Sequence, residues 1–488
     1  MVFVKPAFKL WLSYGKVGPA AWTKPTFLIG DMWEAMRARK TIGQVLETLC
    51  RKNDKEPFFG VYKLLKPILV VKDPELVSEV LVKNFSSFGN NEVTFDGGAD
   101  EVFRENPFSV GLDRWKELRT RLSQAFSPSR VKLAYDDLLT SSRCLADFVA
   151  AAGADTSQDG LLLCKRFTAH ASARVLFGIE SHSLEVGSEP GVFYDMGHEV
   201  FNGSMMQSLR FTAYFFFPPL LHIIGHQLVD WKVINFFRKL MKDSIEYRHK
   251  EGVVRDDFVS HAAKALIVDG KVDEAALKKM ANQAINSYIE TFETSALSVG
   301  STLLLLATHP KEQEQLRAEI RERVKPGQDL DYETVTTLPF LDKVIKETMR
   351  LFPPADTIRR CCTKATRLQS ASGRSVNVEP GTAVYIPVDA LHHDPAIYSH
   401  PHDFWPDHFS AEEIASRPKN TFLGFSEGPR QCPGMKYATL KVKTAIATLL
   451  QRFEVTPGEQ QVLPIKRDPK AFIINYEGGI WLKFRPLP

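Results

Sequence analysis

One long run of helix-forming, largely apolar residues constrains the fold of this chain more than any other feature. It begins near Asp273, which can cap a helix after Gly270, and it continues to His309, where Pro310 follows. At about 1.5 Å per residue, such a helix is roughly 50 Å long and crosses an entire domain. Because it is apolar over much of its length, we expect it to lie at the centre of the molecule.

The rest of the pattern is mostly helical, with two β-rich segments. Residues 56–73 are typical of two strands around a tight connection, and residues 471–484 of a hairpin that turns at Gly478 and Gly479. We therefore expect a mainly α fold of the α+β class, with small β-sheets gathered towards one side. No linker or repeat divides the 488 residues. The prediction is one domain, 1–488, in which residues 1–30 form an N-terminal linker without a full transmembrane anchor.

Charge and cysteine usage exclude several classes of protein. The 62 Lys and Arg residues nearly balance the 58 Asp and Glu residues, and no basic stripe with interleaved aromatics predicts nucleic-acid binding. The six cysteines are dispersed, so neither a disulfide framework nor a CxxC metal site is indicated. A hydrolytic metal site is disfavoured because five histidines lack ligand spacing on one element: His392, His393, His400, His402 and His408.

The stretch FSEGPRQCPG (425–434) places a lone cysteine in a loop rich in glycine and proline. Gly428 and Gly434 permit backbone conformations that a side chain would block, and two prolines stiffen the loop. The following residues have helical periodicity, so Cys432 precedes a helix N-terminus, whose dipole favours a thiolate over a thiol. This setting suits a thiolate ligand; the alternative is an ordinary small buried cysteine.

The middle of the long helix carries three polar residues at i, i+3 and i+4: Glu290, Glu293 and Thr294. This spacing puts them on one face, where two neighbouring carboxylates cannot easily both be ionised. One of them would then be protonated and able to give or relay a proton. The alternative is a salt-bridged pair at a helix surface.

Four motifs in chain order resemble those of the cytochrome P-450 superfamily of haem-thiolate monooxygenases, and the match extends over nearly the whole chain. The matching residues are Trp115 and Arg119 in W-x-x-x-R, Glu293 and Thr294 in the I-helix acid–alcohol pair, Glu347 and Arg350 in E-x-x-R, and Phe425, Gly428, Arg430, Cys432 and Gly434 in the cysteine loop. The details FETSA, LHHDP and SEGPRQC look most like the microsomal branch that contains arthropod detoxication enzymes.

The resemblance implies a role for each matching residue. Cys432 would be the axial thiolate ligand of a haem b iron. Glu293 and Thr294 would deliver protons, while Glu347 and Arg350 would brace the cysteine loop. The residues implied to hold the haem and its propionates are Arg430, Trp115, Arg119, Arg360, Phe425 and Gly434.

The implied reaction inserts one oxygen atom of O2 into a C–H bond or across a C=C bond of a lipophilic small molecule. Its electrons would come from NADPH through a cytochrome reductase, with cytochrome b5 as a second partner. Lys436, Lys441 and Lys443 could form a basic docking face, or could simply solvate their helix. Two rival functions are a haem-thiolate isomerase or dehydratase, and a non-catalytic haem- or lipophile-binding protein.

Two positions depart from the family pattern. Glu290 and Thr291 stand where the I helix usually has Ala-Gly, as in ω-hydroxylases that esterify such a glutamate to a haem methyl. Glu290 would either form this ester, lie beside the oxygen as an acid, or narrow the pocket, and Thr291 would bond back to the Ser287 carbonyl. His408 replaces the arginine that usually completes the Glu347 network, so we expect haem retention to weaken at alkaline pH.

The resemblance also predicts location and pocket. It places the protein at the cytoplasmic face of the endoplasmic reticulum membrane, with Phe211–Leu221 as a contact with the membrane surface; a core position for this segment is the alternative. The pocket would be mostly apolar, with Asp356 and Glu290 as polar handles. Its implied walls are Phe95–Phe108, Ile289–Thr294, Ala355–Ile358 and Ile474–Gly479.

Overall fold

The computed structural model describes residues 21–23, 29–94, 100–202, 205–217, 227–253, 255, 257, 259–260, 267–268, 271–325, 328–471 and 473–488. The α-helices are α2 (Trp33–Met36), α3 (Ile42–Lys52), α4 (Pro74–Ser78), α5 (Phe85–Phe88), α6 (Leu112–Ala125), α7 (Pro128–Leu133), α8 (Tyr135–Ala151), α9 (Gly160–Ser172), α10 (Val192–Asn202), α11 (Met205–Phe216), α13 (Trp231–Glu251), α15 (Glu274–Thr308), α16 (Pro310–Arg323), α17 (Tyr332–Thr336), α18 (Pro339–Leu351), α19 (Val388–His392), α20 (Ala411–Ser416) and α21 (Met435–Arg452). Short π- or 3₁₀-helical segments are η1 (Glu79–Lys83), η2 (Phe103–Glu105), η3 (Ala173–Phe177) and η4 (Pro406–Phe409).

The strands are β1 (Ala21–Trp22), β2 (Phe58–Lys63), β3 (Lys66–Val71), β4 (Gln158–Asp159), β5 (Ile267–Val268), β6 (Lys271–Val272), β7 (Thr357–Cys361), β8 (Thr366–Gln369), β9 (Ser375–Val378), β10 (Ala383–Pro387), β11 (Phe453–Pro457) and β12 (Trp481–Pro486).

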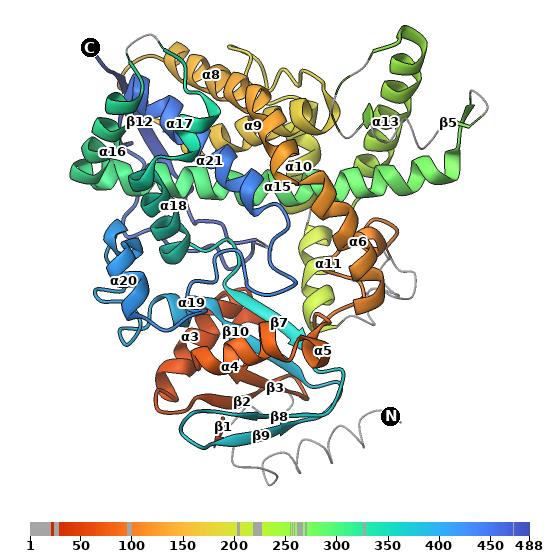
Figure 1. Ribbon diagram of the computed structural model, residues 1–488, viewed down its shortest axis with the longest axis vertical. Coiled ribbons are helices and arrows are strands. Elements are labelled where there is room, and N and C mark those ends of the chain that lie inside the picture. The colour runs from red at the N-terminus through yellow and green to blue at the C-terminus, as the bar shows by residue number, and fades with distance from the viewer. Residues whose placement is uncertain are drawn as a thin grey trace.

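Helix α15 is the predicted long helix, and it runs across the molecule in Figure 1. Asp273 caps it by accepting from the amides of Ala275 and Ala276, and the 35 helical residues end at Thr308. Helices α9, α18 and α21 pack against it, as does α13 towards its N-terminal end. The prediction of a central helix in a helix-dominated fold is confirmed, because α15 contributes apolar residues to two of the buried clusters.

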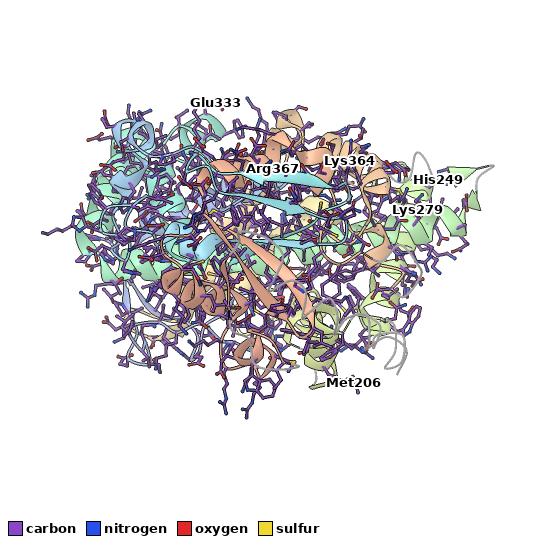
Figure 2. All side chains as sticks on the ribbon, turned by 90° about the horizontal axis from the view of Figure 1, so that it is seen from below. Met206, His249, Lys279, Glu333, Lys364 and Arg367 are labelled. Atoms are coloured by element: carbon purple, nitrogen blue, oxygen red, sulfur yellow. The ribbon has the colours of Figure 1, made fainter. Side chains whose placement is uncertain are left out.

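The main sheet has five strands in the order β1-β2-β3-β10-β7. It lies at one end of the molecule in Figure 1 and is seen from below in Figure 2, where Met206 of α11 projects at the edge. The antiparallel β2–β3 hairpin confirms the prediction for residues 56–73. None of the described helices combines the length and hydrophobicity that crossing a membrane requires.

The prediction of a C-terminal hairpin is wrong. Beyond Gly478 and Gly479 the chain enters β12, which pairs with β11 and β4 in an antiparallel sheet of three strands. Because β11 directly follows α21, its pairing with β12 places the C-terminal strand against the helical core. The two strands are too distant in the sequence for a local turn pattern to predict their pairing.

Candidate active site

The Cys432 loop is held in one shape by backbone hydrogen bonds. The Cys432 amide donates to the Phe425 carbonyl at 2.9 Å, and Phe425 itself packs against the central core. Gly428 has φ +75°, and a Cβ there would lie 2.1 Å from the Leu81 carbonyl oxygen, so only glycine fits. A Cβ on Gly434 would meet nothing within 4 Å, so open space borders the loop immediately after Cys432.

Arg430 ties this loop to the segment before α6. Its guanidinium lies 4.7 Å from the centroid of the Trp115 ring, and none of its described hydrogen-bond acceptors is a carboxylate. Among the described residues, it donates to the backbone carbonyls of Gly89, Pro107 and Val110. Burial lowers the pKa of Arg430 to about 10, because a partly buried cation loses hydration.

Two further arginines add positive charge around the loop. Arg119 of α6 donates to the Gln431 carbonyl at 2.6 Å. Arg360 of β7 donates to the Asn91 side-chain oxygen at 2.6 Å, while its buried Nε has no partner among the described residues. Burial, together with the neighbouring Arg430 charge, lowers the pKa of Arg360 to about 9. The loop therefore brings together a thiol, open space and three cations that call for anionic partners.

These residues fit a haem. An iron porphyrin offers a metal for the sulfur of Cys432 and two propionates for buried guanidinium groups. The open space beside Gly434 and the unpartnered Nε of Arg360 are the observations of this chain that favour such a group. The fold brings three separate stretches of the sequence to one region: Trp115 and Arg119, Arg360, and Arg430 and Cys432.

The predicted electrostatics of Cys432 need correction. Burial raises the pKa of its thiol to about 11, and the Glu290 carboxylate raises this pKa further, whereas the Gly434 amide and Arg119 lower it. The amide of Gly434, which caps the N-terminus of α21, lowers this pKa in the expected direction, but burial outweighs it. A thiolate in this position depends on a cation bound at the sulfur, as in a metal site.

The two acids of α15 do not share an environment, contrary to the prediction. Glu293 forms a buried ion pair with Lys165 of α9 at 2.8 Å, and its Oε2 has no partner among the described residues. Glu290 instead accepts a hydrogen bond from Asn106 at 3.1 Å, and burial alone raises the pKa of Glu290 to about 7. The two positions are only about 60° apart around the helix axis, so it is their partners on other elements, Lys165 and Asn106, that separate the acids.

Two local hydrogen bonds of α15 surround these acids. Thr294 donates its hydroxyl to the Glu290 carbonyl at 2.6 Å. Thr291 donates to the Ser287 carbonyl at 2.9 Å, which confirms the predicted back-bond.

Glu347 and Arg350 form a fully buried bidentate pair on α18, with distances of 2.8 and 2.7 Å. His408 of η4 contacts Glu347 Oε1 through Nδ1 at 3.0 Å and the Ser399 carbonyl through Nε2. Both partners are acceptors, so only the imidazolium, which donates from both nitrogens, satisfies them. Burial would raise the pKa of Glu347, but hydrogen bonds from Arg350 and His408 bring it below its usual value.

His392 is a site residue that sequence reasoning missed. Its Nδ1 donates to the Arg350 carbonyl at 3.0 Å, and its Nε2 accepts from the Leu423 amide at 2.9 Å. The ring also stacks on Phe422. Burial keeps the pKa of His392 well below its usual value, in accord with a neutral ring that donates once and accepts once. His392 thus joins α18 to the start of the cysteine loop. The LHHDP motif, which contains His392, was the sequence signal that could have identified it.

Three weaker expectations are corrected by burial. Lys441 and Lys443 are buried, so of the three lysines only Lys436 is exposed enough for a docking face. Asp356 accepts a hydrogen bond from the Gly43 amide at 2.9 Å, at the start of α3. This hydrogen bond engages the carboxylate that was expected to contact a substrate. Phe211 lies in the core; residues 218–221 of the proposed membrane segment and 95–99 of the proposed pocket wall are outside the described residues.

Comparison with known proteins gives consistent matches along the chain. The sequence model of the family described as Cytochrome P450 matches residues 20–482. The chain is 30% identical to "Cytochrome P450 9e2" of Blattella germanica over 484 residues, which cover 93% of this chain and 90% of that protein. It is 29% identical to "Probable cytochrome P450 6a18" of Drosophila melanogaster over 487 residues, 97% of this chain and 94% of that protein. Identity to "Cytochrome P450 6k1" of Blattella germanica is also 29%, with 98% and 93% covered.

Proposed function

The chain belongs to the cytochrome P450 family of monooxygenase oxidoreductases, as the resemblance to arthropod members predicted, and from this premise we propose its reaction. It inserts one oxygen atom of O2 into a lipophilic small molecule and reduces the other to water, with electrons from NADPH delivered by a reductase. Cytochrome b5 is the proposed second electron donor.

One observation carries this proposal: Cys432 lies in a rigid loop beside open space and three arginines that have no carboxylate partner among the described residues. Cys432 would hold the iron, and Arg119, Arg360 and Arg430, with Trp115, would hold the propionates. When bound, the haem supplies the oxygen-activating chemistry. Arg360 is buried and Arg119 and Arg430 are half-buried, and among the described residues their hydrogen bonds go to carbonyl and amide oxygens; the anions that this group brings would supply the missing opposite charge.

The protein's own residues have distinct proposed tasks. Glu347, Arg350, His408 and His392 keep the loop in position through hydrogen bonds that link α18, η4 and residue 423. Glu290, Glu293 and Thr294 lie on consecutive turns of α15 and hold or move the protons that the reaction consumes.

Glu290 has two chemically distinct fates, an ester to a haem methyl or a free acid. We propose the free acid, because one carboxylate oxygen accepts a hydrogen bond from Asn106, whose side chain is itself buried. That hydrogen bond stabilises an oxygen that carries charge, and an ester would remove the charge.

The proposed location is the cytoplasmic face of the endoplasmic reticulum membrane. Support comes from exposed apolar side chains on and after α11: Met206, Leu209 and Phe217 are 47%, 45% and 39% exposed, and Met206 projects at the edge of the molecule in Figure 2. Such side chains gain from contact with a lipid surface.

The test is an optical titration of the purified protein. The reduced protein with carbon monoxide should give the spectrum of a thiolate-ligated haem, and Cys432→Ser should lose it while remaining folded by circular dichroism. Retention of the same spectrum by the serine variant, or protein without pigment after haem supplementation, would refute the proposal. Spin-state changes on adding candidate lipophiles would then rank substrates.

A further inference from the structure

Arg359, on strand β7, is a half-buried cation without an anionic partner. Its guanidinium makes no hydrogen bond and no ion pair with the described residues, and its Nε atom is buried without an acceptor. An arginine side chain presents five N–H donors, and a buried donor that lacks an acceptor is costly. The guanidinium of Arg359 therefore requires an acceptor from outside the described part of the chain.

Two aromatic rings hold this guanidinium in place. Its carbon atom lies 4.2 Å from the centroid of the Phe215 ring and 5.7 Å from that of Tyr385. Tyr385 stands directly opposite Arg359 in the antiparallel pairing of β7 with β10, so both side chains lie on one face of the main sheet. Phe215 comes from the end of α11 that meets β7 in Figure 1. Contact with the rings restricts the flat guanidinium, which is thereby pre-organised for a planar anion.

The carboxylate that acts on this region, Glu92, is already engaged by other donors. Its Oε1 accepts from Lys63, and its Oε2 accepts from the Tyr385 hydroxyl at 2.5 Å. Lys63 also donates to the Phe215 carbonyl at 2.9 Å, so it takes up the partial negative charge at the C-terminal end of α11. Two cations thus face one carboxylate, and the positive charge of Arg359 is left uncompensated.

Arg359 lies at the border of the proposed substrate pocket. Arg360, the next residue on β7, is one of the residues proposed to hold the haem propionates, and it donates to the Asn91 side chain. Tyr214, on the last turn of α11, packs against Phe103 of the implied pocket wall, with 6.3 Å between the ring centroids. The sheet, α11 and the segment before α6 therefore meet around Arg359, where a bound molecule can contact both a cation and aromatic rings.

We propose that Arg359 binds the carboxylate of the substrate, and that the substrates of this enzyme are amphipathic monocarboxylates with a long apolar chain. The inference rests on the proposed monooxygenase function and narrows its lipophilic substrate to this class. The carboxylate accepts two N–H donors from the guanidinium fork and supplies the missing negative charge. The apolar chain packs along the aromatic side chains of the pocket wall. Arg359 is a specificity-determining residue, because it binds the end of the substrate that does not react.

The test is a calorimetric titration of the haem-loaded protein with three amphiphiles of equal chain length: decanoate, decan-1-ol and decyltrimethylammonium. The dissociation constant of decanol divided by that of decanoate isolates the contribution of the acid group. We expect Arg359→Gln to lower this ratio about tenfold, because a charge-assisted pair is lost, and to leave the binding of decanol unchanged. Decyltrimethylammonium should bind more tightly to the glutamine variant than to wild type. The same ratio in both proteins would overturn the proposal.

Two further variants separate a specific site from a general effect of charge. Arg367→Gln removes an exposed arginine of β8, labelled on the underside of the molecule in Figure 2, and should leave the ratio unchanged. Arg359→Lys keeps the charge but loses the planar fork, so it should keep only part of the preference for decanoate. An equal loss in Arg367→Gln and Arg359→Gln would trace the preference to net charge and contradict a site at Arg359.

Optical titration separates this inference from the proposed function. Decanoate should change the spin state of the haem in wild type, because the chain of a substrate reaches the haem site. Binding of decanoate without a spin-state change would overturn its assignment as a substrate. Wild-type protein that lacks the thiolate–carbon monoxide spectrum refutes the monooxygenase function. A normal spectrum, with the same decanol-to-decanoate ratio in wild type and Arg359→Gln, refutes only the role of Arg359.

Discussion

His408 should make haem retention sensitive to alkaline pH, because its two hydrogen bonds need an imidazolium. Glu347 and the Ser399 carbonyl are both acceptors, so loss of the ring proton leaves one of them without a donor. Both Glu347 and His408 are fully buried, and no solvent replaces the lost bond. A hydrogen bond to a charged group contributes about 1.5–3 kcal/mol. We therefore expect a loss of about 2 kcal/mol, or roughly 30-fold in the folded-to-unfolded ratio.

The other titrating groups change the free energy of unfolding with pH in the opposite direction to His408. The two hydrogen bonds of His408 require a donor on each ring nitrogen, so loss of one ring proton removes one of these bonds. Glu347 behaves oppositely: its pKa is lowered, so its contribution is lost as pH falls. Burial lowers the pKa of Lys441 to about 7, so folding favours its neutral form and stability from this group grows as pH rises above 7. The wild-type slope therefore mixes opposing effects, and only a difference between variants isolates His408.

The assay compares wild type with His408→Arg and His408→Gln by urea unfolding and by haem content, from about pH 6 to about pH 9.5, which brackets ordinary histidine titration. Arginine keeps two or more donors and its charge, whereas glutamine has no charge. The stability of wild type relative to the arginine variant should fall by about 2 kcal/mol as pH rises. The glutamine variant should show no such fall relative to arginine. Parallel pH curves for wild type and His408→Arg would refute the reasoning.

Four further predictions concern residues around the same site. His392→Ala should lower the free energy of unfolding by about 1–3 kcal/mol and reduce the bound haem, because the Leu423 amide and the Arg350 carbonyl lose their hydrogen-bond partner. Urea midpoints measure the stability and absorbance measures the haem content. An unchanged haem content would contradict this prediction. Gly428→Ala should prevent haem incorporation, since its Cβ would lie 2.1 Å from the Leu81 carbonyl oxygen. Gly373→Ala is the matched control for the pigment recovered, because Gly373 has a similar φ of +81° but its Cβ would meet nothing within 4 Å. Lys441→Met should raise the free energy of unfolding at neutral pH and reduce the increase of this free energy above pH 7. The reason is that an apolar chain of similar size replaces the buried amine. Urea unfolding at two pH values checks this prediction. Haem extracted under denaturing conditions should have its unmodified mass, and a haem that stays attached to the peptide containing Glu290 would show that the ester forms instead.

Local sequence signals predicted the elements whose cause is local. The cap at Asp273 and the apolar run after it suffice to specify α15, and the glycines of the cysteine loop specify its tight backbone. The back-bond from Thr291 to Ser287 was also predictable, because its partners are one helical turn apart.

Signals of this kind say nothing about which surface of a helix meets which neighbour. Lys165 and Glu293 form an ion pair because α9 packs on α15. Strand β12 pairs with β11 because both strands cover the same part of the core. Lys441 is a lysine at a position where α21 faces α15, and its amine donates to the Thr291 carbonyl. The burial of Lys165, Glu293 and Lys441 results from tertiary contacts, which override the ordinary preference of lysine and glutamate for solvent.

The two departures from the family pattern are accommodated by different means. His408 is a single replacement within a network that already exists, because its acceptors, Glu347 and a backbone carbonyl, also suit an arginine. Glu290 is not an isolated replacement, since its donor is Asn106, a residue 184 positions away that is buried and also holds Asn286. Removing the Asn106 amide would take away the one hydrogen bond that lowers the pKa of Glu290 and would leave this acid more fully protonated. Glu290 and Asn106 therefore form a hydrogen-bonded pair, and a substitution that restores a small residue at position 290 also requires a new acceptor, or a water, for the Asn106 amide.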